Sequence, residues 1–344
     1  MNIFKNKKIK YLIFSFLGML IIVAVAGFVV FENYMSSAIT ETSVVYIPTG
    51  STFDRQLDSL HVNGNIRNFD RFKKYLNLRK VKNIRPGRYV LKQGISYHDL
   101  IIKLRNGEQE AVKVTFNNIR TMDKLAGVIS GYLEVDSLSL INVLNDPATA
   151  YSYGFDQNNF IGMFIPDTYH IYWNTDAEGF IDRMNKEYNR FWNQRRMEKL
   201  QKSGLTKYEA ITLASIVAEE TIKTDEMPRV AGVYLNRLKI NMPLQADPTV
   251  KYAVGDFTLR RILNKHLETD SPYNTYMYGG LPPGPICVPP VTAIDAVLDP
   301  EEHNYLYFCA RDDFSGYHNF AVNHAQHIKN RNAYINALNQ RGIR

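Results

Sequence analysis

Several features that mark common protein classes are scarce or absent in this chain of 344 residues. It has only two cysteines, Cys287 and Cys309, which excludes a dense disulfide framework, although in an oxidising compartment these two could pair with each other. No Gly-x-Ser-x-Gly segment occurs, which argues against a serine nucleophile on a strand-to-helix turn. Internal repeats and low-complexity tracts are also missing, so a repeat architecture is excluded.

A metal site is not expected either. His318, His324 and His327 lie near the end of the chain, but their spacing does not match a compact zinc motif. We expect His318 and His324 to donate hydrogen bonds in or near a binding cleft.

The charge of the chain gives no indication of nucleic-acid binding. The net charge is +7, and Lys5, Lys7, Lys8 and Lys10 supply four of these positive charges within the first ten residues. The rest of the chain is therefore only slightly basic, and no nucleic-acid partner is predicted.

A long uncharged segment follows these lysines. Residues 11–31 contain no charged side chain, and as a helix they would span about 31 Å, which matches the core of a bilayer. The lysines predict that residues 1–10 stay in the cytoplasm and that the rest faces outward. A cleaved signal peptide is the alternative, with Met35-Ser-Ser-Ala as a weak cleavage site, but its apolar core would be shorter.

The exported part divides into a stalk, a small module and a larger domain, all of the α+β class. Residues 32–43 are polar and predict a stalk. Residues 44–111 predict a strand, helices at 69–78 and 96–106, and a strand after Arg85-Pro-Gly, an order that resembles the LysM-like modules of cell-wall proteins. This module is as compatible with a spacer as with a glycan-binding site.

Residues 112–344 predict a larger mixed α+β domain. Apolar spacing indicates helices at 180–201 and 226–242. We expect these helices to surround a sheet that includes segments such as 112–116 and 305–309.

One helix of this domain has two adjacent acids on different faces. Thr206 and Glu209 have the spacing of a capping box at its start. At about 100° per residue, Glu220 shares a face with apolar residues such as Ile216, whereas Glu219 shares one with Ser215.

The two acids should therefore behave differently. Glu219 can form an i,i+4 pair with Lys223. Glu220 has no local cation, so burial among aliphatic side chains should raise its pKa and suit it to general acid catalysis near neutral pH. The alternative is that Glu220 lies at a helix edge and pairs with a distant arginine.

Further motifs accompany this helix in a characteristic order. They are Phe164-Ile-Pro-Asp-Thr-Tyr, Asn236-Arg-Leu, Leu244-Gln-Ala-Asp-Pro-Thr-Val-Lys-Tyr, Tyr273-Asn-Thr-Tyr, Gly280-Leu-Pro-Pro-Gly-Pro-Ile, Tyr305-Leu-Tyr-Phe, Gly316-Tyr-His-Asn-Phe and Asn323-His. Taken together, the set closely resembles the MltG-type (YceG-like) endolytic murein transglycosylases, bitopic inner-membrane enzymes that cut peptidoglycan glycan strands. The resemblance covers nearly the whole chain.

The resemblance also selects one glutamate. In that family the catalytic acid is the second glutamate of a motif like Ala-Ser-Ile-Ile-Glu-Lys-Glu-Thr, which aligns here with residues 214–221 and falls on Glu220. Ala218 replaces the first family glutamate, and Glu219 stands where the family often has lysine. The motif and the helical-face argument thus indicate the same residue.

The resemblance implies a lyase with one catalytic carboxyl and no metal or other cofactor. Glu220 would protonate the glycosidic oxygen between N-acetylmuramic acid and N-acetylglucosamine, then deprotonate the muramic C6 hydroxyl, leaving a 1,6-anhydro end. Polar and tyrosine side chains suit sugar binding. The predicted substrate-binding residues are Gln245, Asp247, Thr249, Tyr273, Asn274, Tyr276, Asn323 and His324.

Three alternatives remain open at the level of sequence. Asp247 could act as a second catalytic carboxylate and make the enzyme a hydrolase. The Pro- and Gly-rich motifs, including Tyr273-Asn-Thr-Tyr, could be rigid turns. The chain could also be a noncatalytic scaffold that grips glycan. The expected partners are glycan strands, the membrane through residues 11–31, and peptidoglycan synthases.

Overall fold

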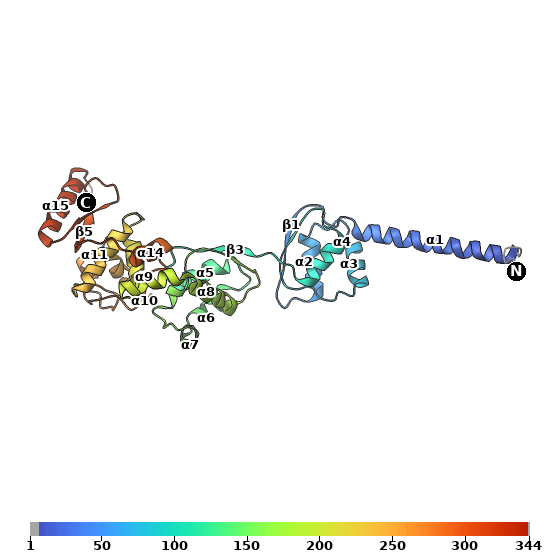
Figure 1. The fold of residues 1–344 in the computed structure, drawn as a ribbon, viewed down its shortest axis with the longest axis horizontal. Coiled ribbons are helices and arrows are strands. Elements are labelled where there is room, and N and C mark those ends of the chain that lie inside the picture. Colours follow the sequence, from blue (N-terminus) through green and yellow to red (C-terminus); the bar gives the residue numbers. More distant parts are fainter. Residues whose placement is uncertain (1–6, 260, 343–344) are drawn as a thin grey trace. The chain divides into compact units, whose positions relative to one another are not determined.

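The computed structural model describes residues 7–259 and 261–342 of the chain (Figure 1). These residues form two compact units. The first unit runs to Val112 and also includes His170–Asn174, and the second contains the rest of the chain. The boundary falls at the two-stranded ribbon of β3 (Val112–Thr115) and β4 (Thr168–Ile171).

The first unit begins with the long apolar helix α1 (Lys7–Met35), whose apolar side chains are exposed. Among the described residues, it is the one helix long and apolar enough to cross a membrane. It contains the whole predicted span 11–31. Residues 1–6 of the predicted cytoplasmic tail lie outside the described residues.

The module after α1 has the order strand, helix, helix, strand, helix. Strands β1 (Ser43–Ile47) and β2 (Gly87–Leu91) pair antiparallel, with Ser43 opposite Leu91. Helices α2 (Phe53–Asn63), α3 (Phe69–Leu78) and α4 (Tyr97–Asn106) begin at the capping side chains of Thr52, Asn68 and Ser96. The helices predicted at 69–78 and 96–106 are thus present.

The segment 32–43 differs from the predicted polar stalk. Tyr34, Ala38 and Ile39 are buried in the core of the module. The Tyr34 hydroxyl accepts a 3.0 Å hydrogen bond from Arg79 Nε, and its ring packs edge-on against Tyr75. Three scattered side chains thus attach this segment to the module, although its average composition is polar.

The second unit is mainly helical. The β3–β4 and β5–β6 ribbons are separate, so the expected common sheet containing 112–116 and 305–309 is not formed. Its other elements are α5 (Met122–Ser130), α6 (Ser137–Leu144), α7 (Pro147–Ser152), a 3₁₀ turn (Phe160–Met163), α8 (Ala177–Phe191), α9 (Gln194–Ser203), α10 (Lys207–Glu220), α11 (Met227–Lys239), α12 (Asp247–Val254), α13 (Asn264–Leu267), α14 (Val291–Leu298), β5 (Tyr307–Ala310), β6 (His318–Ala321) and α15 (His324–Gln340).

The single helix predicted at 180–201 is wrong, because the chain breaks there into α8 and α9. Asn193 lies between them in an extended conformation, and its side chain accepts a 3.1 Å hydrogen bond from the Arg196 backbone. Asparagine favours this capping geometry over a helix interior. Helix α9 then ends at Gly204, which has a φ of +73°.

Helix α10 lies in the core of the second unit and packs against α11 and α14. The predicted capping box is present: the Thr206 hydroxyl accepts from the Glu209 backbone, and the Glu209 carboxylate accepts from the Thr206 backbone. The polar face of α10, which Glu219 shares with Ser215, is expected to be exposed to solvent but is buried. Thr212 and Ser215 are almost completely covered. Ser215 donates to the Thr212 carbonyl and accepts from the Ile286 backbone, so its burial leaves no polar group unpaired.

Candidate functional site

The two acids at the end of α10 have different surroundings, as the sequence predicted, but Glu219 has another partner. Both of its carboxylate oxygens accept hydrogen bonds from Arg120 Nη2, at 2.9 and 2.7 Å. The predicted pair with Lys223 is wrong, because α10 ends at Glu220 and residue 223 no longer lies on it. The Lys223 ammonium instead lies over the Tyr317 ring.

Glu220 lines a polar pocket that Glu219 does not reach. Its Oε1 accepts a 2.6 Å hydrogen bond from the Tyr234 hydroxyl on α11. Burial raises the pKa of Glu220 to about 7, and the nearby charge of Asp247 acts in the same direction, while the Tyr234 hydrogen bond and Arg237 partly oppose this shift. Glu220 is also the last residue of α10, where the negative end of the helix dipole disfavours a carboxylate.

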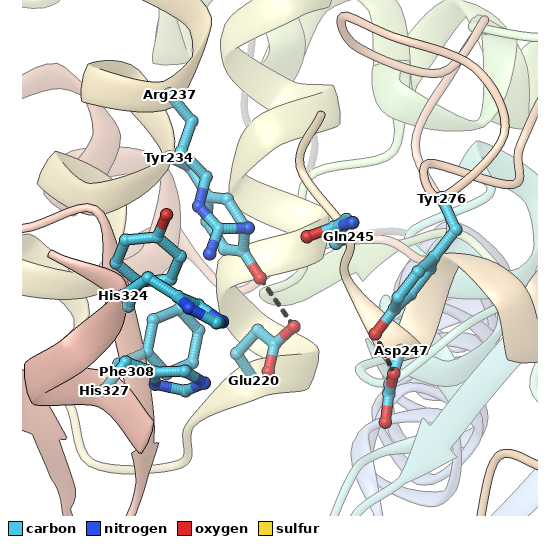
Figure 2. A pocket seen from close by; sticks show the side chains of 10 residues that line it. Glu220, Tyr234, Arg237, Gln245, Asp247, Tyr276, Phe308, His324 and His327 are labelled. Carbon is cyan, nitrogen blue, oxygen red and sulfur yellow. Dashed lines mark hydrogen bonds between the residues drawn. The ribbon is translucent and has the colours of Figure 1, made fainter. Parts of the chain in front are cut away.

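A pocket of about 310 Å³ opens beside this carboxyl. In Figure 2, Glu220 lies between the histidines of α15 and the pair formed by Asp247 and Tyr276. The residues lining the pocket are Glu220, Tyr234, Arg237, Gln245, Asp247, Tyr276, Tyr307, Phe308, His324 and His327. The lining is thus rich in hydroxyl, amide and aromatic groups.

Arg237 holds two walls of the pocket together. Its guanidinium is buried and donates 2.6 Å hydrogen bonds to the carbonyls of Leu306 and Leu244. Leu306 precedes β5, and Leu244 precedes Gln245, so one side chain connects the strand that carries Tyr307 to the loop that carries Gln245. Burial lowers the pKa of Arg237, and its charge acts on Glu220.

Asp247 and Tyr276 form the opposite wall. The Tyr276 hydroxyl donates a 2.6 Å hydrogen bond to Asp247 Oδ1, and both residues line the pocket. Burial and this hydrogen bond raise the pKa of Tyr276, so it remains a donor at neutral pH. Gln245, two residues before Asp247, is exposed and has a φ of +49°, an uncommon conformation for a non-glycine residue.

Three predicted substrate-binding residues make hydrogen bonds within the fold and lie away from this pocket. Thr249 is fully buried and donates a 2.7 Å hydrogen bond to the Ala246 carbonyl. Asn274 is also fully buried, and its Nδ2 donates to the carbonyls of Leu267 and Thr269, both at 2.9 Å. The exposed Asn323 caps α15 by accepting a hydrogen bond from the Gln326 backbone. None of the three lines the pocket beside Glu220.

Tyr273 does not line the pocket either. It packs against Tyr252, with ring centroids 4.6 Å apart. Four predicted binding residues therefore line the pocket, namely Gln245, Asp247, Tyr276 and His324, while Thr249, Tyr273, Asn274 and Asn323 do not.

The three C-terminal histidines separate in the structure. His324 and His327 line the pocket, whereas His318 lies elsewhere, with its Nδ1 2.7 Å from the buried carboxylate of Glu226. Among the described residues, no group of three His, Cys, Asp or Glu side chains is placed to hold a metal ion. Cys287 and Cys309 are free thiols.

Five residues that line the pocket were not predicted from the sequence to belong to the site. Tyr234 and Arg237 are three residues apart on α11, which places them on one helix face, but the sequence shows no signal that this face meets Glu220. Tyr307 and Phe308 lie in a motif that we singled out without assigning either residue a role. His327 was considered only as a metal ligand.

A second hollow, of about 740 Å³, also includes Glu220 and Asp247 in its lining. There is thus open space on more than one side of Glu220 and Asp247. Chemically, the arrangement offers one carboxyl that exists in both its protonated and its charged form near neutral pH, held by a hydroxyl donor beside a second carboxylate. Such a group can deliver a proton to a leaving oxygen and then take one back.

Comparisons with known proteins agree on one family. The YceG-like family matches residues 45–333 of the chain. The endolytic murein transglycosylase of Bacillus subtilis is 30% identical over 86% of this chain and 86% of its own length. The enzyme of the same name from Streptococcus pneumoniae is 26% identical over 96% of this chain, which spans 66% of that relative. The crystal structure of a yceG-like protein from Listeria monocytogenes is 29% identical, with a TM-score of 0.57 over 84% of this chain and 99% of that one.

Proposed function

The chain belongs to the YceG-like family, and from this premise we propose that it is an endolytic murein transglycosylase, a lyase that cuts the glycan strands of peptidoglycan. Two curated relatives carry that activity in their names. The pocket supports the proposal, because its tyrosine rings and its amide, carboxylate and imidazole groups suit the ring faces and hydroxyls of sugars.

Glu220 is the general acid and base of this reaction. Protonated, it gives its proton to the glycosidic oxygen between N-acetylmuramic acid and N-acetylglucosamine. As a carboxylate, it then removes the proton from the muramic C6 hydroxyl, which attacks C1 and closes a 1,6-anhydro ring. The observation that carries the proposal is the pKa of Glu220 near 7 at the edge of an open polar pocket.

The other pocket residues position the acid and the strand. Tyr234 fixes the orientation of the Glu220 carboxyl through its 2.6 Å hydrogen bond. Asp247 is held by Tyr276 and stabilises the positive charge that develops at the sugar ring. Gln245 and His324 contact the sugar hydroxyl and N-acetyl groups.

A hydrolase is the second candidate, because Asp247 lines the same pocket as Glu220. In that reaction Asp247 would act as the second carboxylate that glycoside hydrolysis normally requires. The two reactions differ in their products: a hydrolase leaves an ordinary reducing end, and a lytic transglycosylase leaves an anhydro end.

The same proposal gives the chain a place in the cell. Helix α1 anchors it in the cytoplasmic membrane with the N-terminus inside, so that the chain after α1 lies outside. There the enzyme acts on nascent strands beside peptidoglycan synthases. We also propose that the module at 44–111 is LysM-like, and that it serves as a spacer or as a glycan-binding site.

Mass spectrometry of the fragments released from purified peptidoglycan tests the proposal. The detergent-solubilised full-length protein should release anhydro-ended fragments, and its Glu220→Gln variant should release none. Reducing ends from the wild type would identify a hydrolase. Binding of strands without any cleavage, on nascent or mature substrate, would favour a noncatalytic scaffold.

A further inference from the structure

The second hollow beside Glu220 differs in character from the first. Apart from Glu220 and Asp247, the two have no lining residue in common. The additional walls come from the C-terminal end of α10, from α12, from Leu259, Arg261 and Ile262, and from α15. We call this hollow the second groove.

Three cations line the second groove: Lys251, Arg261 and Arg331. Arg261 and Arg331 are exposed, Lys251 is partly buried, and none of the three forms an ion pair with another described residue. They come from three separate elements, so their convergence on one groove is a product of the fold. The groove therefore offers cationic groups that are free to bind an anion.

The acids of the groove do not account for these cations. Glu219 is already paired with Arg120. The main charge effects on Glu220 come from Asp247, Arg237 and Glu219 and not from the three groove cations. The cations are therefore available to a ligand instead of serving to balance the reacting acid.

Apolar side chains lie among the same cations. Leu259 and Ile262 come from the segment after α12, and Ile335 and Leu338 come from α15. Ile335 is 41% exposed, so its side chain is accessible to an apolar part of a ligand. A ligand that suits this lining carries both anionic groups and small apolar groups.

The substrate has such a component next to the bond that is cut. Each N-acetylmuramic acid residue bears a short stem peptide, which in its common forms has free carboxylates and alanine methyl groups. The peptide is attached to the sugar whose glycosidic oxygen Glu220 protonates, so it must leave the cleft beside Glu220. The second groove opens at that point.

We propose that the second groove binds the acidic stem peptide of the glycan strand, with Arg261 and Arg331 as the main carboxylate ligands, so that peptide-bearing strands are preferred over bare glycan. This inference rests on the proposed function only for the position of the sugar chain. Arginine suits the role because its planar guanidinium binds carboxylates in a bidentate manner.

A binding measurement tests this without relying on turnover. Two fluorescent disaccharide-peptide probes would be titrated into the full-length protein in detergent, one with free peptide carboxylates and one with the carboxylates amidated. We expect the wild type to bind the free-acid probe about tenfold more tightly, as one or two carboxylate–arginine contacts would give. Raising the salt concentration should reduce this ratio, since exposed charges are screened.

The variant R261Q/R331Q should bind both probes equally, with little change in its affinity for the amidated one. Lys329→Gln is the matched control, because residue 329 is on the same helix but about 200° around from Arg331 and does not line the groove. It should keep the wild-type ratio. All three substituted side chains are exposed, so the variants should fold, which their melting curves would verify.

Equal affinity of the wild type for the two probes would overturn the inference, as would an unchanged ratio in R261Q/R331Q. A parallel cleavage assay separates this from the proposed function. If neither peptide-bearing nor peptide-free strands are cut while the probe ratio persists, the proposed activity fails and the peptide groove stands.

Discussion

The Tyr234 hydroxyl donates a 2.6 Å hydrogen bond to Oε1 of Glu220, and so connects the middle of α11 to the end of α10. This bond stabilises the charged form of an acid whose burial favours the neutral form. The balance of the two effects places the pKa of Glu220 at about 7, where the group can both give and accept a proton.

Tyr234→Phe should move the pH dependence of cleavage to higher pH. Glu220 must be protonated to act as the acid, so kcat/KM of the wild type should fall as pH rises through about 7. Losing the hydrogen bond removes a contact that lowers this pKa, so the fall should come later. Tyr278→Phe is the control, because its hydroxyl bonds to Asp270 on the surface. An unshifted profile in Tyr234→Phe would contradict the proposed role of the bond.

Glu220→Gln should lower the rate of strand cleavage by about 10²–10⁴-fold, because no other group replaces the proton donor. Glu219→Gln should retain most activity, since the Glu219 carboxylate is already paired with the Arg120 guanidinium. Rates of fragment release by the two variants, measured side by side, decide the assignment. Loss of activity in Glu219→Gln alone would mean that the acid is Glu219.

Glu220→Gln should also stabilise the protein above neutral pH. The pKa of Glu220 is raised from 4.5 in the unfolded chain to about 7 in the folded protein, so folding retains a proton that unfolding releases. The stability that Glu220 contributes is therefore fully present below about pH 4.5 and is lost as the pH rises through about 7. The neutral variant does not have this loss, which is on the order of 3 kcal/mol. Melting temperatures at pH 5 and pH 8 should show a gap between variant and wild type that widens with pH.

Asp247→Asn distinguishes the two proposed reactions. If Glu220 works as the single carboxyl, the variant should be slower because charge stabilisation at the sugar is lost, but its products should still have anhydro ends. If Asp247 is the second carboxylate of a hydrolase, the products with reducing ends should disappear. Mass spectrometry of the fragment ends provides the measurement. Tyr276→Phe, which removes only the donor to Asp247, should have the same effect in milder form.

Asn274→Ala should destabilise the second unit by about 1–3 kcal/mol, because the carbonyls of Leu267 and Thr269 lose their common donor in a buried site. We expect activity to fall as well, since the same loop carries Tyr276. Asn264→Ala, at an exposed position in the same segment, should change neither property. An unaltered denaturation curve for Asn274→Ala would indicate that the residue contacts substrate, as the sequence first suggested.

The helices with strong capping signals were predicted closely, whereas the strand pairing was not. Thr206, Asn68 and Ser96 identify helix starts because a cap acts over three or four residues. The same principle, applied to Asn193, could have predicted the break between α8 and α9. Pairing of β3 with β4 and of β5 with β6 depends on segments that meet only in the folded chain, and no local pattern specified it.

The sequence by itself determined the membership of the YceG-like family, the apolar helix α1 and the choice of Glu220 over Glu219 as the candidate acid, because contiguous motifs and helical periodicity are local properties. Only the tertiary structure decided which polar residues face the pocket. Tyr276 lines it, while Asn274, two residues away, is buried in hydrogen bonds to backbone carbonyls. Both are polar residues of one motif, and what separates them is the set of distant groups that folding brings to each.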